Sequence, residues 1–114
     1  MTRIGVDIVD VERIKRLYQQ YGGRFLGRVF TQIEIDYALS ARGNRRYERL
    51  AARFAAKEAV MKAIGHAVPL RSVRVENAPS GEPIVTCEHA RGKIEASLSH
   101  TDRLAIAYVL IEGE

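Results

Sequence analysis

The chain has 114 residues, of which 46% are hydrophobic and 28% are charged. This length predicts a single domain over residues 1–114, and the composition excludes disorder, collagen and a disulfide-rich scaffold. No apolar run approaches the roughly 20 residues that span a bilayer. The only cysteine, Cys87, has no partner for an internal disulfide. We therefore expect a cytoplasmic protein that does not bind a membrane.

The cations are more numerous than the acids and unevenly placed. Lys and Arg total 18 against 14 Asp and Glu, for a net charge of +4, and 14 of the cations are arginines. Five cations lie between residues 13 and 28 with no acid among them, and five lie between residues 42 and 53 with only Glu48. Such clusters favour nucleic acid, an acidic protein or a phosphorylated small molecule as partner. A solvated helix face is the ordinary alternative.

The N-terminal half is predicted to hold one strand and then helices. Apolar residues at positions 4, 6 and 8 have the period of a strand. Asp10 is the expected N-cap of a helix that ends at Gly22–Gly23, and its apolar stripe consists of Ile14, Leu17, Tyr18 and Tyr21. A short helix or turn over residues 24–30 follows. The capping box Thr31–Glu34 then begins a helix that should end near Gly43.

A longer helix is expected from about residue 45 to residue 64, with Gly65 as its C-cap and Leu50, Phe54 and Met61 on its buried face. After Pro69 the chain becomes rich in β-branched residues, which predicts strands over residues 72–76, 84–87, 94–99 and 104–111. The last two should form a hairpin. The fold class is therefore α+β: an N-terminal strand, a helical half and a C-terminal antiparallel sheet.

Two acids and a lysine are the candidates for chemistry. Asp7 shares a strand face with Gly5 and Val9, where a carboxylate is costly to bury unless it is paired, hydrogen-bonded or bound to a cation. Capping of backbone amides is the commoner role of such an acid. Glu58 and Lys62 lie four residues apart on the long helix, as in a surface ion pair worth about 0.2–0.5 kcal/mol.

Asp7 and Glu58 together would suit Mg²⁺, which commonly takes one or two carboxylates, waters and substrate phosphates. The spacing of the two residues does not establish that they meet. The three histidines lack the spacing of a zinc site, and there is no glycine-rich phosphate loop and no nucleophile elbow.

Three segments together resemble the holo-acyl-carrier-protein synthases, the small bacterial 4′-phosphopantetheinyl transferases. Residues 4–14 (IGVDIVDVERI) resemble the opening of that family, and residues 53–63 (RFAAKEAVMKA) resemble its central helix. Residues 97–101 (SLSHT), followed by the strand over residues 104–109, resemble its C-terminal hairpin. The similarity covers nearly the whole chain. The turn Gly81–Glu82–Pro83 departs from it by carrying an acid where many members have lysine, so no cationic contact is expected there.

The resemblance implies transfer of 4′-phosphopantetheine from coenzyme A to a serine of apo-acyl carrier protein, with release of adenosine 3′,5′-bisphosphate, in fatty acid biosynthesis. It implies Mg²⁺ on Asp7 and Glu58, with Glu58 and Lys62 as the catalytic residues. It assigns coenzyme A to Arg53, Lys57, Lys62, His100 and Thr101. It assigns binding of the acidic carrier protein to Arg13, Lys15, Arg16, Arg24 and Arg28. Family members typically form homotrimers with active sites at the subunit interfaces.

A non-catalytic module that binds nucleic acid is the alternative from another class. It would explain the positive charge but would leave Asp7 without a role. Aromatic residues make up only 7% of the chain, and none interleaves with the basic clusters as base stacking requires. We therefore expect no nucleic-acid partner.

Overall fold

The computed structural model describes residues 1–113. The chain begins with strand β1 (Thr2–Asp10) and continues through helices α1 (Val11–Tyr21), α2 (Gly23–Val29), α3 (Gln32–Leu39) and α4 (Asn44–Ile64). A 3-10 turn, η1 (Leu70–Ser72), leads to strands β2 (Val73–Asn77), β3 (Pro83–Cys87), β4 (Gly92–His100) and β5 (Leu104–Gly113). The predicted α+β class is confirmed.

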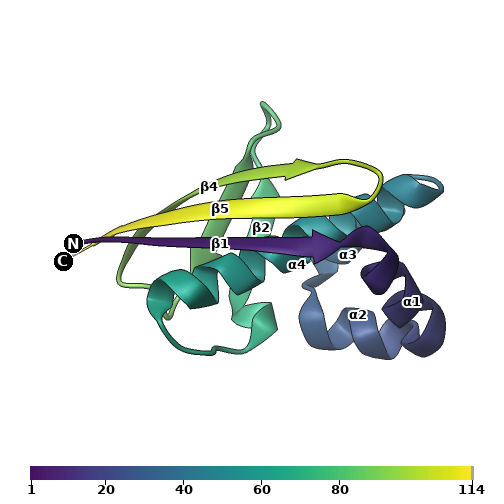
Figure 1. The fold of residues 1–114 in the computed structure, drawn as a ribbon, viewed down its shortest axis with the longest axis horizontal. Helices are drawn as coiled ribbons and strands as arrows, with labels where there is room; N and C mark the ends of the chain where they lie inside the picture. Colours follow the sequence, from purple (N-terminus) through teal and green to yellow (C-terminus); the bar gives the residue numbers. More distant parts are fainter. Residues whose placement is uncertain (114) are drawn as a thin grey trace.

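The strands form two antiparallel sheets. One has the order β1–β5–β4, so the first and last strands of the chain lie side by side, and the other is the β2–β3 hairpin. In Figure 1, α4 runs beneath the larger sheet, α1 and α2 lie at one end of it, and the two termini meet at the other end. The predicted hairpin of the last two strands is confirmed as β4 and β5.

Helix α4 fills the centre of the molecule. Apart from Glu58, every residue from Leu50 to Val60 is buried, and the helix packs against both β1 and β5. Five of these residues are alanines, whose small side chains allow close contact. At Gly5 an added Cβ would lie only 2.0 Å from the carbonyl oxygen of Ala59. Glycine is therefore required at this crossing of strand and helix.

Two local predictions about α1 differ from the structure. Asp10 does occupy the N-cap position of α1, but its side chain makes no capping hydrogen bond. The amide of Val11 instead donates to the carbonyl oxygen of Arg103, at 2.9 Å, in the turn between β4 and β5. Tyr21, predicted on the buried stripe, is exposed because it is the last residue of α1.

Helix α3 ends at Leu39 and not near Gly43. Side-chain donors bond the carbonyl oxygen of Tyr37 in its last turn, where a continuing helix would use a backbone amide. The hydroxyl of Ser40 and the guanidinium of Arg49 both donate to the carbonyl oxygen of Tyr37, at 2.7 and 2.8 Å. The capping box at its start is confirmed, with hydrogen bonds in both directions between Thr31 and Glu34.

Glu34 also forms a buried ion pair with Lys57. Both side chains are fully buried, and Lys57 Nζ lies 2.9 Å from Glu34 Oε1. The ammonium also donates to the carbonyl oxygens of Leu70 and Val73, while Glu34 accepts from the amide of Val75 at 2.7 Å. Burial lowers the pKa of Lys57, and the Glu34 carboxylate opposes that shift. The pair thus joins α3, α4 and β2.

Lys57→Met should destabilise the fold by about 3–5 kcal/mol, because it leaves the Glu34 carboxylate buried without its cation. Chemical denaturation with linear extrapolation measures the loss. Lys57→Met combined with Glu34→Gln should recover part of it, since neither partner is then charged. Lys93→Met is the matched control, because the Lys93–Glu95 pair is exposed and should contribute no more than about 1 kcal/mol. Equal losses for the two single variants would contradict the prediction.

Candidate functional site

Asp7 lies in the middle of β1 and faces α4. Its side chain is 17% exposed, and its Oδ1 lies 3.0 Å from Lys62 Nζ. Lys62, near the C-terminus of α4, also donates to the carbonyl oxygen of Val6 at 3.0 Å. A cation thus offsets the cost of burying the Asp7 carboxylate. The hydrogen bonds of the described residues give Asp7 no backbone amide to cap.

Glu58 lies on α4 one turn before Lys62 and therefore on the same face of the helix. It is half-buried within an otherwise buried stretch. Among the described residues, no ion pair joins Glu58 to Lys62, so the surface pair that the spacing allowed is not formed. Lys62 reaches across to β1 instead, and the carboxylate of Glu58 stays available beside that contact.

Asp7 and Glu58 fit a hard divalent cation better than a zinc ion. Within residues 1–113, no group of three or more His, Cys, Asp or Glu side chains is placed to hold a metal. A structural zinc site needs four protein ligands. Mg²⁺ takes one or two carboxylates and completes its octahedron with water and substrate phosphates. Asp7 and Glu58 carry oxygen donors of this kind, and Lys62 beside Asp7 carries a positive charge.

His100 ends β4 and lies against the first turns of α4. Its Nδ1 is 2.9 Å from Oε1 of Glu48, whose Oε2 accepts from Asn44 at 2.8 Å. Thr101 occupies the turn to β5, where its hydroxyl accepts from the amides of Arg103 and Leu104. Sequence reasoning did not predict the contact of Glu48 with His100. The available signal was its position as the only acid in the second basic cluster.

Arg53 is buried and only partly free to meet a ligand. Its guanidinium stacks on the ring of Tyr37, with Cζ 4.3 Å from the ring centroid, and Nη2 donates to Asn77 at 2.9 Å. Among residues 1–113, its buried Nε has no hydrogen-bond partner. Desolvation by burial lowers the pKa of Arg53. The Nε atom is thus the part of this side chain that is left without a protein partner.

The assignment of Lys57 to coenzyme A needs correction. Its ammonium has three donors, and they are engaged by Glu34 and by two backbone carbonyl oxygens in the core. No surface of Lys57 is exposed. The sequence placed it beside Glu58 in the same motif, but adjacent residues of a helix point in different directions. Lys57 therefore stabilises the fold.

The first basic cluster lies on α1 and α2. Arg13, Arg16, Arg24 and Arg28 are exposed, whereas Lys15 is half-buried with Nζ 5.7 Å from the ring centroid of Tyr47. A groove of about 360 Å³ separates the two helices. Its lining combines apolar side chains with two of the arginines: Leu17, Tyr21, Arg24, Phe25, Arg28 and Val29. Such a surface suits a partner with both acidic and apolar groups.

The turn between β2 and β3 carries Glu82. The hydroxyl of Ser80 donates to its carboxylate and holds the pKa of Glu82 below its usual range. Glu82 is therefore negatively charged at neutral pH, and the turn offers no lysine or arginine to a phosphate.

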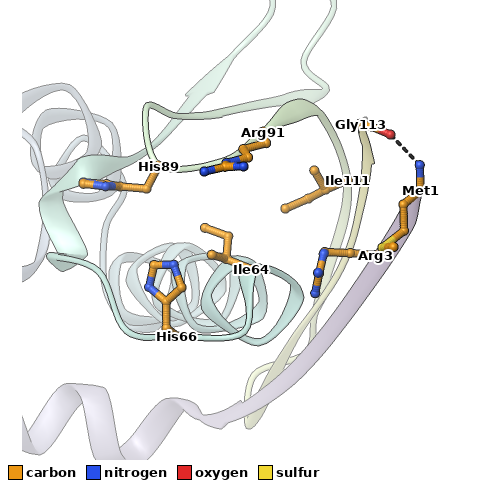
Figure 2. Close-up of a pocket in the computed structure, with 8 residues that line it drawn as sticks. All are labelled: Met1, Arg3, Ile64, His66, His89, Arg91, Ile111 and Gly113. Carbon is orange, nitrogen blue, oxygen red and sulfur yellow. Dashed lines mark hydrogen bonds between the residues drawn. The ribbon is translucent and has the colours of Figure 1, made fainter.

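A separate pocket of about 340 Å³ lies at the end of the molecule where the termini meet. Figure 2 shows two arginines, Arg3 and Arg91, and two histidines, His66 and His89, around a floor formed by Ile64 and Ile111. None of the described residues that line it is an acid or a predicted site residue. It is distinct from the Asp7–Lys62 contact.

Comparison with known families and sequences places the chain in one family. The model of the 4′-phosphopantetheinyl transferase superfamily matches residues 3–109. Holo-[acyl-carrier-protein] synthase of Thermodesulfovibrio yellowstonii is 44% identical over 95% of this chain and 96% of its own length. The synthase of Koribacter versatilis is 42% identical, covering 95% of each chain.

Solved structures show the same arrangement of elements. The holo-(acyl-carrier-protein) synthase of Bacillus anthracis, in complex with CoA (3′,5′-ADP), has a TM-score of 0.88 and 33% identity over 98% of this chain and 96% of its own. The Helicobacter pylori synthase, in complex with coenzyme A, has a TM-score of 0.85 and 26% identity over 96% of this chain and 99% of its own. Within residues 1–113, no helix combines the length and the apolar character needed to cross a membrane.

Proposed function

Because the chain belongs to the 4′-phosphopantetheinyl transferase superfamily, we propose that it is a holo-acyl-carrier-protein synthase. It transfers 4′-phosphopantetheine from coenzyme A to a serine of apo-acyl carrier protein and releases adenosine 3′,5′-bisphosphate. The observation that carries this proposal is the meeting of Asp7 and Lys62, one helical turn from Glu58, where β1 crosses α4. These residues supply the charges that transfer of a phosphate-linked group requires.

Asp7 and Glu58 are the proposed ligands of Mg²⁺. When bound, the ion would neutralise the charge of the coenzyme A pyrophosphate and orient it. The side chain of Lys62 is 58% exposed, so its ammonium can turn from Asp7 to a phosphate oxygen. There it would stabilise the negative charge of the leaving adenosine 3′,5′-bisphosphate. His100 at the end of β4 and Thr101 in the turn that follows it are proposed to contact coenzyme A.

The groove between α1 and α2 is the proposed docking site for acyl carrier protein. Its two rim arginines, Arg24 and Arg28, meet an acidic surface, and Phe25 offers an apolar contact. Arg13 and Arg16 extend the positive surface along α1, and Lys15 lies at its border. Such peripheral charges act mainly on the rate of association and its salt dependence.

The outer face of the larger sheet supports a homotrimer. Six large apolar side chains on this face are 41–61% exposed: Ile4, Val6, Ile8, Leu104, Ile106 and Tyr108. The strand register sets Val6 opposite Tyr108 and Ile8 opposite Ile106, so these side chains form one continuous patch. Contiguous apolar surface of this kind marks an interface. Two further copies of the chain are its proposed occupants.

Nucleic acid is not favoured as a partner. Arg49 and Arg53 of the second basic cluster stack on Tyr37, with guanidinium carbons 4.2 and 4.3 Å from the ring centroid. The guanidinium of Arg49 also donates to the carbonyl oxygen of Tyr37. Contacts within the protein occupy these two guanidinium groups, so the surface offers less positive charge to a nucleic acid than the residue counts suggest.

Transfer between coenzyme A and a carrier protein is consistent with the cytoplasmic location expected from the single cysteine.

Asp7→Asn and Glu58→Gln should each lower the transfer rate by about 100-fold or more, because each removes a charged group that acts at the reacting phosphate. The shapes of the side chains are kept, so both variants should retain a cooperative thermal melt. Mass spectrometry of the carrier at varied Mg²⁺ measures the transfer. Glu76→Gln, an exposed acid on β2, is the control. A folded Asp7→Asn variant with the wild-type rate would exclude Asp7 from the site.

Arg24→Glu should raise the KM for apo-acyl carrier protein and leave the KM for coenzyme A near its original value. The effect should shrink with added salt, since exposed charges are screened over about 8 Å at physiological ionic strength. Steady-state kinetics with each substrate varied, at low and high salt, measures it. Arg74→Glu makes the same charge change at an exposed position on β2 and should have little effect. Equal increases in the KM for the carrier protein in both variants would show that Arg24 contributes only through the net charge of the protein.

Ile106→Glu should convert the trimer to monomers, because a carboxylate cannot be buried at an apolar interface without a partner. Size-exclusion chromatography with light scattering gives the mass, and circular dichroism checks the fold. Ile84→Glu is the control, since Ile84 is similarly exposed on β3 and lies on the other sheet. A monomeric wild-type protein, or an Ile106→Glu variant that remains trimeric, would contradict this assembly.

A further inference from the structure

We propose that Glu48 is a positioning residue for His100 and holds its imidazole so that Nε2 points toward a phosphate of coenzyme A. The proposal rests on the transferase function and assigns to that site a residue that does not touch the substrate. It follows from the hydrogen-bond network that connects the start of α4 with the end of β4.

The contact between the two side chains defines the tautomer of the ring. His100 Nδ1 lies 2.9 Å from Glu48 Oε1. An ionised carboxylate only accepts hydrogen bonds, so Nδ1 must carry the hydrogen of this contact. The second nitrogen, Nε2, is then the one left for a ligand. Carboxylates fix the tautomer and orientation of metal-binding histidines in the same way.

Glu48 is itself held in place. Its side chain is 16% exposed against 36% for His100, so the carboxylate lies behind the ring. Asn44 donates to Glu48 Oε2 at 2.8 Å and to the carbonyl oxygen of Asp102 at 3.0 Å. Both carboxylate oxygens are therefore engaged, and the turn that follows His100 is tied to the same helix.

The arginines around Glu48 do not account for its presence. Arg46 donates to the carbonyl oxygen of Ala41 at 2.9 Å, and Arg49 donates to Tyr37 and Ser40. Among residues 1–113, the only ion-pair partner of Glu48 is His100. The negative charge of Glu48 weakens the attraction of this basic cluster for an anion. Orientation of the His100 imidazole is a function that would offset this loss of attraction.

The consequence for binding is directional. A phosphate oxygen accepts hydrogen bonds, and a protonated imidazole whose Nδ1–H is held by Glu48 has one further donor, Nε2–H. Without Glu48 the ring is free to rotate and to present either nitrogen. Loss of Glu48 should therefore weaken coenzyme A binding through His100, with no effect on the carrier protein.

Nitrogen-15 NMR of the His100 imidazole tests the geometry without requiring activity. The wild-type ring, when neutral, should carry its hydrogen on Nδ1, and Glu48→Ala should lose that preference. A wild-type ring with the hydrogen on Nε2 would overturn the proposal. A wild-type protein that fails to modify any carrier, with Nδ1–H intact, would instead refute the transferase function and leave this contact established.

Kinetics tests the role. Glu48→Ala should raise the KM for coenzyme A about tenfold, as losses of orienting groups typically do, while the KM for the carrier stays unchanged. Glu48→Gln should retain most of the affinity, because its amide oxygen can still accept from Nδ1–H. Since the two residues act as one unit, Glu48→Ala should add nothing in a His100→Ala background. Additive losses would overturn the proposal.

Asn44→Ala separates positioning of the ring from anchoring of the turn. It breaks the contacts of Asn44 with Asp102 and with Glu48 Oε2 but keeps the contact of Glu48 Oε1 with His100, so its effect on the KM for coenzyme A should be smaller than that of Glu48→Ala. An equal effect in a variant whose neutral His100 ring still carries its hydrogen on Nδ1 would assign Glu48 to the turn and overturn the proposal. Thermal melts of all variants show whether the fold is kept, and Glu48→Gln provides the test if Glu48→Ala does not fold.

Discussion

The close contact between β1 and α4 determines where the proposed reactive side chains of this protein lie. A side chain at Gly5 would collide with the backbone of Ala59, and the buried alanines of α4 keep the helix equally near the rest of the sheet. This short distance brings Lys62 within hydrogen-bonding reach of Asp7, 55 residues away in the chain. Small residues thus create the site, although they take no part in its chemistry.

The same strand serves two purposes because its side chains alternate. Gly5, Asp7 and Val9 face α4, whereas Ile4, Val6 and Ile8 are exposed on the opposite face. A shift of one residue in the register with β5 would exchange the two sets. The long antiparallel pairing of β1 with β5 therefore protects the proposed metal site and the proposed trimer interface together.

The cations of this basic chain have three different environments. Lys57 is in the core and neutralises Glu34, and Arg53 is enclosed against Tyr37. The arginines of α1 and α2 remain exposed around an apolar groove. The enclosed cations cannot steer an acidic partner, so net charge alone overstates the positive potential of the surface. The buried cations instead hold α3, α4 and β2 in register around the site.

Local sequence patterns determined most of the fold. The alternation in β1, the Thr31–Glu34 capping box and the glycine that ends α4 each depend on neighbouring residues, and each prediction was correct. The family motifs indicated Asp7, Glu58 and Lys62 as site residues, and that assignment stays a prediction. Contacts between distant segments were decided by the tertiary structure. Lys57 is buried because α3 and β2 cover its side of α4. Glu48 contacts His100 because the end of β4 lies beside the start of that helix. Spacing along one helix carries no information about what packs against it, so the contacts of these two residues could emerge only from the folded chain.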